Sequence, residues 1–147
     1  MSILSEIQEQ MKIAMKSRDA DRLNVLRFLK AKLAEAKIAQ NRELTEEEEI
    51  VVIQKNAKMR KEAIKQYQQN DRLNLAELEQ NELKIIQEFL PQQLSEGELE
   101  QLVWEAIAEI GATTMQDMGK AMGASMKKIA GRADGKKVQE IVRRKLG

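Results

Sequence analysis

Apolar side chains recur at three- and four-residue intervals along nearly the whole chain, which is the spacing of one face of an α-helix. Within residues 1–91 the pattern predicts four helices, separated near residues 17–19, at 41–45 and at the polar stretch 68–71. Pro91 ends the fourth of them, because proline disfavours a helical conformation at the residue before it and has no N–H to donate. We therefore expect an N-terminal helical domain over residues 1–91.

Two capping boxes mark the starts of predicted helices. Thr45 is followed three residues later by Glu48, and Ser95 is followed by Glu98 at the same spacing. In such a box the hydroxyl accepts the free N–H of the third helical residue, and the glutamate accepts the N–H of the cap. The second box comes directly after residues 91–94, which we interpret as a short linker between two domains.

A second apolar pattern covers residues 95–147 and predicts three short helices. Gly111 is placed to end the first of these helices in a left-handed conformation. Thr114 is placed to cap the second helix, Gly131 to end it, and Asp134 to cap the third. The sequence therefore predicts an all-α protein whose C-terminal part is a small three-helix domain over residues 95–147.

Composition agrees with an all-α fold and narrows the chemistry. Aromatic residues make up only 3% of the chain, and it has no cysteine and no histidine, which removes thiolate chemistry, the usual general base and the commonest metal ligand. Serine and threonine lie at predicted caps or, like Ser125, inside a helix. We assign no catalytic residue, no metal site and no cofactor. Because no apolar run approaches the length of a membrane span, we expect a cytoplasmic protein without a membrane segment.

Charge is segregated within the C-terminal domain. Residues 95–117 contain six acids and no Lys or Arg, whereas residues 118–147 contain nine Lys or Arg against Asp134 and Glu140, a net charge of +7. Such a basic segment is typical either of ordinary solvated surface or of a patch that binds a phosphate backbone. The candidate nucleic-acid-binding residues are Lys127, Lys128, Arg132, Lys136, Lys137, Arg143, Arg144 and Lys145.

Small and apolar residues have a packing interpretation. Gly119 and Gly123 are four residues apart on one helical face, which allows a second helix to approach closely, and we expect them to pack against the helix over 95–110. Trp104 falls off the apolar stripe of that helix, so we expect it at the interface of the two domains, with a partner site as the alternative. The methionines expected as adaptable core of the second helix are Met115, Met118, Met122 and Met126.

The glycine-containing segment 131–137 has two interpretations. In the first it is a turn between the last two helices, in which Gly131 ends one helix, Asp134 caps the next and Gly135 follows it. In the second, the free N–H groups at the start of the last helix and the cations around them also bind a phosphate. The Asp134 carboxylate would repel such an anion, which favours the turn.

Several short motifs resemble those of the YqeY family. The most specific are Leu90-Pro91-Gln92-Gln93-Leu94 and the region that runs from Met118-Gly119-Lys120 to Gly131-Arg132-Ala133-Asp134-Gly135-Lys136. Further matching motifs are Asp21-Arg22-Leu23, Arg42-Glu43-Leu44-Thr45 and Arg60-Lys61-Glu62. The resemblance covers essentially the whole chain, and it departs from the family pattern at Ala63 and Asn74, where Ser and Asp are expected.

The resemblance implies an N-terminal helical domain joined to a small helical domain similar to the tail of the GatB subunit of glutamyl/aspartyl-tRNA amidotransferase. It therefore implies a non-catalytic binding module whose basic C-terminal face contacts tRNA or a tRNA-handling protein complex. One alternative is an accessory part of a tRNA-dependent amidotransferase, a carbon–nitrogen ligase with glutamine as amido-N-donor. Another is a protein-binding helical adaptor. The sequence leaves the oligomeric state open.

Overall fold

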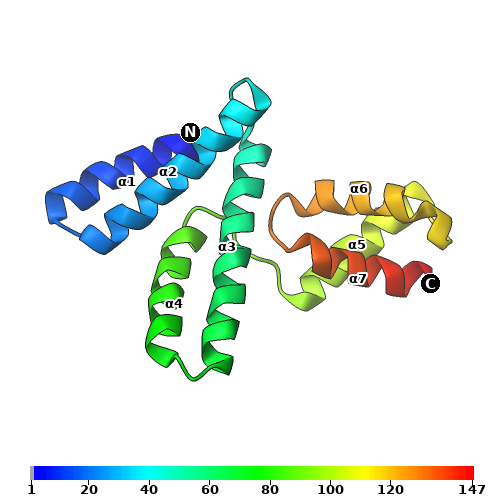
Figure 1. Ribbon diagram of the computed structural model, residues 1–147. Helices are drawn as coiled ribbons and strands as arrows, with labels where there is room; N and C mark the ends of the chain where they lie inside the picture. Colours follow the sequence, from blue (N-terminus) through cyan, green and yellow to red (C-terminus); the bar gives the residue numbers. More distant parts are fainter. Residues whose placement is uncertain (1) are drawn as a thin grey trace. The chain divides into compact units, whose positions relative to one another are not determined.

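The computed structural model describes residues 2–147, and every regular element of the described chain is a helix, without a strand. This confirms the predicted all-α class. The chain divides into two compact units, residues 1–90 and 91–147, each with its own apolar core. The elements are α1 (Ile3–Ser17), α2 (Ala20–Gln40), α3 (Glu46–Gln69), α4 (Leu73–Gln87), α5 (Glu96–Ile110), the short 3-10 helix η1 (Met115–Asp117), α6 (Met118–Ile129) and α7 (Gly135–Leu146) (Figure 1).

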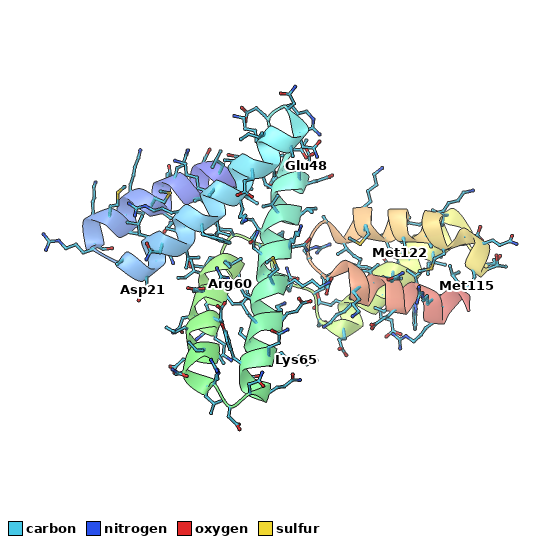
Figure 2. All side chains as sticks on the ribbon, in the orientation of Figure 1. Asp21, Glu48, Arg60, Lys65, Met115 and Met122 are labelled. Atoms are coloured by element: carbon cyan, nitrogen blue, oxygen red, sulfur yellow. The ribbon has the colours of Figure 1, made fainter. Side chains whose placement is uncertain are left out.

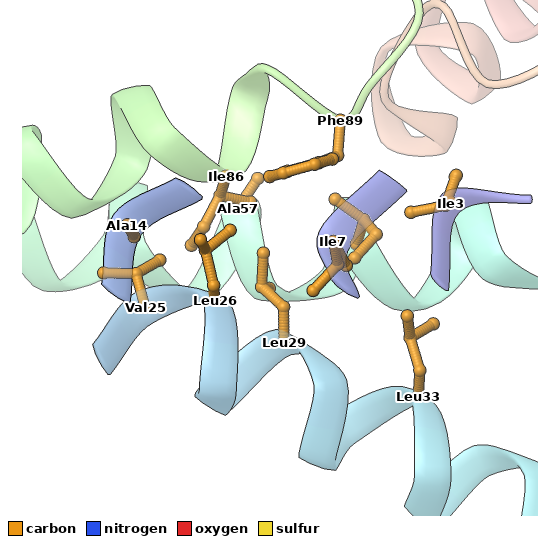
Figure 3. Close-up of a cluster of buried hydrophobic side chains, with 11 residues drawn as sticks. Ile3, Ile7, Ala14, Val25, Leu26, Leu29, Leu33, Ala57, Ile86 and Phe89 are labelled. Carbon is orange, nitrogen blue, oxygen red and sulfur yellow. The ribbon is translucent and has the colours of Figure 1, made fainter. Parts of the chain in front are cut away.

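The N-terminal unit is built from two helical hairpins, α1 with α2 and α3 with α4 (Figure 1). All four helices contribute to one apolar core, in which Ile7, Leu26, Ile53 and Ile86 are fully buried (Figure 3). Phe89 closes this core just beyond the end of α4. The predicted four helices are therefore confirmed, and their apolar faces meet as the three- and four-residue periodicity requires.

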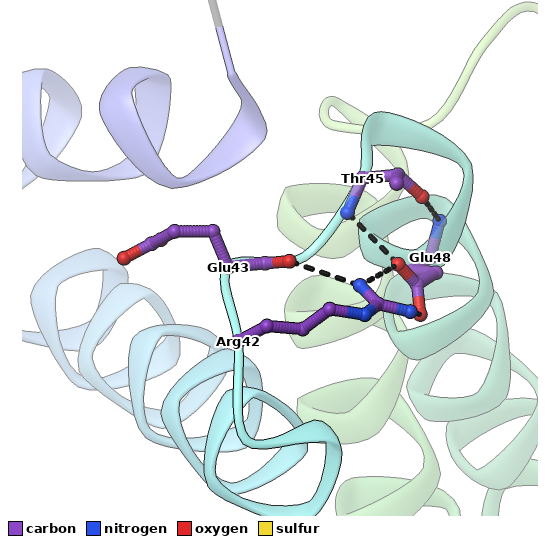
Figure 4. Close-up of polar contacts among 4 residues, drawn as sticks. All are labelled: Arg42, Glu43, Thr45 and Glu48. Atoms are coloured by element: carbon purple, nitrogen blue, oxygen red, sulfur yellow. Dashed lines mark hydrogen bonds and ion pairs between the residues drawn. The ribbon is translucent and has the colours of Figure 1, made fainter.

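The start of α3 shows the predicted capping box. The N–H of Glu48 donates to the Thr45 hydroxyl at 3.2 Å, and the N–H of Thr45 donates to the Glu48 carboxylate at 3.0 Å. The Arg42 guanidinium donates to both Glu48 oxygens, at 2.7 and 2.9 Å, and also to the carbonyl of Glu43 (Figure 4). The hydrogen bonds from Arg42 and then from Thr45 lower the pKa of Glu48 to about 2. The Glu48 carboxylate thus fixes the chain that leads into α3, because it accepts hydrogen bonds from both Thr45 and Arg42.

A buried carboxylate joins α3 to the start of α1. Glu49 is 4% exposed, and its oxygens accept the N–H groups of Ile3 at 3.3 Å and Leu4 at 2.9 Å. The first N–H groups of a helix have no partner within the helix, and the positive end of the helix dipole favours a negative charge there. Glu49 therefore supplies the capping of α1 from a different helix, in addition to the Ser2 hydroxyl, which accepts the N–H of Ser5.

Arg60 connects three helices of the N-terminal unit. Its guanidinium, on α3, lies 2.9 Å from a carboxylate oxygen of Glu79 and 2.5 Å from one of Glu82, both on α4. The same group lies 5.2 Å from the centroid of the Phe28 ring, on α2. Arg60 is labelled in Figure 2. This partly buried cluster gives a structural role to charges that the helical pattern alone places on solvated faces.

The C-terminal unit packs α5, α6 and α7 around a second apolar core. Val103, Ala121, Ile129, Val138 and Val142 are fully buried in it. The N-cap of α5 is Ser95 with Glu98, as predicted, and Gly111 ends α5 in the left-handed conformation, at φ 68°. The three predicted helices are present, with a turn of 3-10 helix added before the second.

Residues 91–94 are part of the C-terminal unit, which differs from the linker expected from the sequence. The N–H of Leu94 donates to the carbonyl of Arg132 at 2.8 Å, and the Gln93 side-chain amide donates to the carbonyl of Gly131 at 3.3 Å. The Leu94 side chain packs against the second core. The fourth helix ends at Gln87, four residues before the proline that was predicted to end it, and the residues after Pro91 are fixed by hydrogen bonds.

Over the described part of the chain, no helix has the length and apolar character needed to cross a membrane.

Candidate nucleic-acid interface

The turn between α6 and α7 is built by two residues in the left-handed conformation. Ala130, at φ 50°, and Gly131, at φ 80°, turn the chain away from α6. The helix therefore ends one residue earlier than predicted, with Ala130 at the C-cap position and Gly131 after it. Glycine suits this conformation because it has no β-carbon to clash with the backbone.

Arg132 is engaged inside this turn. Its Nε donates to the carbonyl of Ile129 at 2.9 Å, and its Nη2 donates to the carbonyl of Lys128 at 3.2 Å. These carbonyls belong to the last turn of α6 and have no partner within the helix. Arg132 thus caps the negative end of α6, and it contributes less to an open phosphate site than its charge suggests.

Asp134 and Gly135 behave as predicted for a helix start. The Asp134 carboxylate accepts the N–H of Lys136 at 3.2 Å, and α7 begins at Gly135. A β-carbon at Gly135 would lie 3.6 Å from the Cε atom of Met126, an ordinary contact. The carboxylate occupies the position in which a phosphate would accept the first N–H groups, so the geometry favours the turn interpretation of this segment.

Two further candidate cations have partners on α5. Lys128 forms ion pairs with Glu109 and, at 3.7 Å, with Glu105. The hydrogen bond that the Lys128 ammonium donates to the Glu109 carboxylate raises the pKa of Lys128. The Lys145 ammonium lies 5.0 Å from the centroid of the Trp104 ring. Partners on the acidic helix therefore hold these two cations against the fold.

The remaining five candidates have exposed side chains, and none of them forms an ion pair with a described residue. Helical geometry places the four from α7 opposite its buried face, which consists of Val138, Ile141, Val142 and Leu146. The fifth lies in the last turn of α6, next to the chain that leads into α7. These five residues, here called the outer cations, are Lys127, Lys136, Lys137, Arg143 and Arg144.

Gly119 and Gly123 do not pack against α5, so that prediction is wrong. Both are exposed, and a β-carbon added to either would meet nothing within 4 Å. The buried face of α6 is formed instead by Ala121, Ser125 and Ile129. Ala121 and Ser125 are also small and four residues apart, so the close packing that was assigned to the glycines falls to this second pair.

The methionines divide between core and surface. Met118 and Met122 pack against the second core, as predicted. Met115 is 45% exposed and Met126 is 36% exposed, so the core assignment is wrong for these two. Figure 2 labels Met115 at the start of this region and Met122 within α6. The solvent-facing side of α6 thus combines glycine, methionine and lysine.

Lys120 is a further exposed cation that the candidate set omits. It lies two helical turns before Lys127, on the same side of α6. Hydrogen bonds from the N–H groups of Thr113 and Thr114, and to a lesser degree the charge of Lys120, lower the pKa of Asp117. These hydrogen bonds hold the start of the 3-10 helix η1, and α6 begins after it at Met118 rather than directly after Thr114.

Comparison with known proteins identifies several relatives. The chain is 32% identical over 89 residues to an uncharacterised protein of Schizosaccharomyces pombe, covering 60% of this chain and 72% of the relative. It is 29% identical over 147 residues to the altered inheritance of mitochondria protein 41 of Pyrenophora tritici-repentis, covering 95% of this chain and 81% of that protein. It is 46% identical over 57 residues to a glutamyl-tRNA(Gln) amidotransferase subunit of Thermococcus gammatolerans, covering 36% of this chain and 9% of that subunit.

The family model described as Yqey-like protein matches residues 4–146, almost the whole chain. It covers both units and both of the motifs that the structure brings together at Leu94 and Arg132. The sequence resemblance is therefore confirmed, and the partial match to an amidotransferase subunit agrees with a relationship of the GatB/YqeY type. The chain belongs to the YqeY-like family.

Proposed function

We propose that this protein is a non-catalytic RNA-binding module, whose outer cations contact tRNA within a tRNA-handling assembly. The single observation that carries the proposal is the set of five outer cations, which have no counter-ion among the described residues. Four of them lie on the outer face of α7, where like charges repel one another and do not stabilise the helix. A phosphate backbone would neutralise them and release its own counter-ions.

The position of these cations supports binding rather than folding. Folding uses Lys128, Arg132 and Lys145, each of which contacts a carboxylate, a carbonyl or an aromatic ring inside the unit. The outer cations lie opposite the buried face of α7 and at the end of α6. A ligand can therefore approach them without any change in the core.

The relationship to an amidotransferase subunit supports the RNA class. The relative is named for a glutamyl-tRNA(Gln) substrate, and the shared part is 9% of that subunit. So small a share favours a module that assists in binding. A second candidate function is an accessory part of a tRNA-dependent amidotransferase, which the same match favours. It predicts that the purified chain raises amidation by the enzyme's other subunits and has no amidation activity alone.

Titration of fluorescently labelled tRNA at several salt concentrations tests the proposal. The natural chain should bind at low salt, and Arg143→Glu with Arg144→Glu should abolish binding. The matched control is Lys58→Glu with Lys61→Glu, which changes the same charge on exposed residues of α3 and should bind like the natural chain. Absence of binding by the natural chain at low salt would refute RNA binding. Equal binding by the two double variants would refute the outer face of α7 as the binding surface. A stable protein partner without RNA would then favour the adaptor alternative.

A further inference from the structure

The outer face of α7 has an acidic residue at its centre. Glu140 is the only acid in this helix, and it is exposed. Lys136 and Lys137 lie four and three residues before it, and Arg143 and Arg144 lie three and four residues after it. The face therefore consists of a pair of cations, one carboxylate and a second pair of cations, in that order.

Glu140 forms no ion pair with these neighbours. Residues three and four apart on a helix are close enough to pair, and a glutamate followed four residues later by a basic residue is the favourable order. Other pairs of this kind form in the chain, such as Lys32 with Glu35. No ion pair or hydrogen bond from a described residue reaches the Glu140 carboxylate, which leaves all its acceptor positions open to a ligand.

The spacing of these residues suits a ligand that has two rows of phosphates, with hydroxyl donors between the two rows. The two cation pairs are seven residues apart, or about 10 Å along the helix at 1.5 Å per residue. Base-paired RNA holds the phosphates of its two strands at a fixed separation. Between them its wide, shallow minor groove displays ribose 2′-hydroxyl groups. A carboxylate only accepts hydrogen bonds, and a hydroxyl can donate one.

Single-stranded RNA fits this surface less well. Unpaired bases are bound mainly by stacking on aromatic rings. None of the outer cations has an aromatic neighbour on its own helix, because α6 and α7 contain no Phe, Tyr or Trp. The one aromatic residue of the C-terminal unit, Trp104, is on α5 and is in contact with Lys145. A flexible strand would also lose conformational freedom on meeting two fixed cation pairs.

We propose that α7 binds base-paired RNA across the minor groove of the duplex. In this arrangement Lys136 and Lys137 contact the phosphates of one strand, and Arg143 and Arg144 contact those of the other. The Glu140 carboxylate accepts a hydrogen bond from a ribose 2′-hydroxyl group. This inference rests on the proposed RNA binding. It adds that the bound RNA is base-paired and that Glu140 distinguishes RNA from DNA.

The first test uses fluorescence anisotropy with three labelled probes of equal length and sequence: an RNA duplex, a DNA duplex and a single RNA strand. The chain of residues 1–147 should bind the RNA duplex most tightly at every salt concentration. If the single strand or the DNA duplex binds as tightly as the RNA duplex, the inference is wrong while RNA binding itself stands. If no RNA probe binds at low salt, the proposed function fails as well.

The second test separates the hydrogen bond of Glu140 from its charge. Glu140→Ala removes both, so the preference for RNA duplex over DNA duplex should fall about threefold to tenfold, the contribution of one hydrogen bond. Glu140→Gln keeps a carbonyl acceptor and should bind both duplexes more tightly while retaining the preference. If Glu140→Ala strengthens binding to both duplexes by the same factor, Glu140 only repels phosphate and its proposed role is refuted.

Discussion

The backbone N–H of Leu94 donates to the carbonyl oxygen of Arg132 at 2.8 Å. This bond joins the segment after Pro91 to the turn between α6 and α7. The segment and the turn belong to the two most distinctive motifs of the sequence. Gln93 adds a second bond to the same turn, and Leu94 packs against the core. The two motifs therefore form one structural element, which holds the turn from which α7 and its cations begin.

Truncation of Leu94 should destabilise the C-terminal unit selectively. Leu94→Ala removes a partly buried side chain, and we expect a loss of about 1–2 kcal/mol in the free energy of unfolding. Trp104 is the only tryptophan of the chain and lies on α5, so its fluorescence in denaturant follows this unit. Gln92→Ala, at an exposed neighbour, is the control. Equal denaturant concentrations at the midpoint of unfolding for both variants would show that the Leu94 side chain does not stabilise the C-terminal unit.

Removal of a buried hydroxyl should stabilise the same unit. The Ser125 Oγ atom is fully buried and has no hydrogen-bond partner within residues 2–147. An unsatisfied buried polar group is unfavourable, and alanine is also a better helix former than serine. Ser125→Ala should therefore raise the free energy of unfolding by about 1 kcal/mol, measured by the fluorescence of Trp104. A loss of stability would mean that the hydroxyl forms a bond in solution.

The Glu48 carboxylate predicts a specific dependence on acid. Its pKa falls from 4.5 to about 2 in the folded chain because Arg42 and Thr45 donate to it. A lowered pKa stabilises the fold above pH 4.5, and that contribution disappears as the pH falls from 4.5 towards 2. Glu48→Gln removes the titrating group, so its unfolding temperature, followed by circular dichroism, should depend less steeply on pH across this interval.

The control for this effect is Glu47→Gln, in the same first turn of α3, where the side chain is exposed. It should keep the acid dependence of the natural chain. Parallel pH profiles for Glu48→Gln and the natural chain would contradict the role of the Arg42–Glu48 contact.

Signals from residues close together in the sequence are sufficient to predict most of the helix starts and ends. Both capping boxes, the Gly111 helix end and the Asp134 cap depend on residues close together in the chain, and the structure confirms them. The packing face of α6 could not be chosen in this way. Gly119 with Gly123 and Ala121 with Ser125 have the same small size and the same spacing, so periodicity alone does not decide which pair is buried.

The candidate site was predicted as a set of charges, without their partners. Lys128 contacts Glu109 and Lys145 contacts Trp104, and in each case the partner lies on α5, far away in the sequence. The carbonyls that Arg132 caps are close in sequence, but only the left-handed turn brings its side chain back to them. Charge patterning thus indicates a basic surface, and tertiary structure separates the cations held by the fold from the outer cations.

The salt dependence of tRNA binding tests the central claim most directly. Each phosphate contact contributes about 0.7–0.9 to the slope of log affinity against log salt concentration. Replacing Arg143 and Arg144 with Gln should therefore reduce that slope by about 1.4–1.8, while the same replacement at Lys58 and Lys61 leaves it unchanged. An identical slope for the natural chain and the Arg143/Arg144 variant would contradict phosphate binding by the outer face of α7.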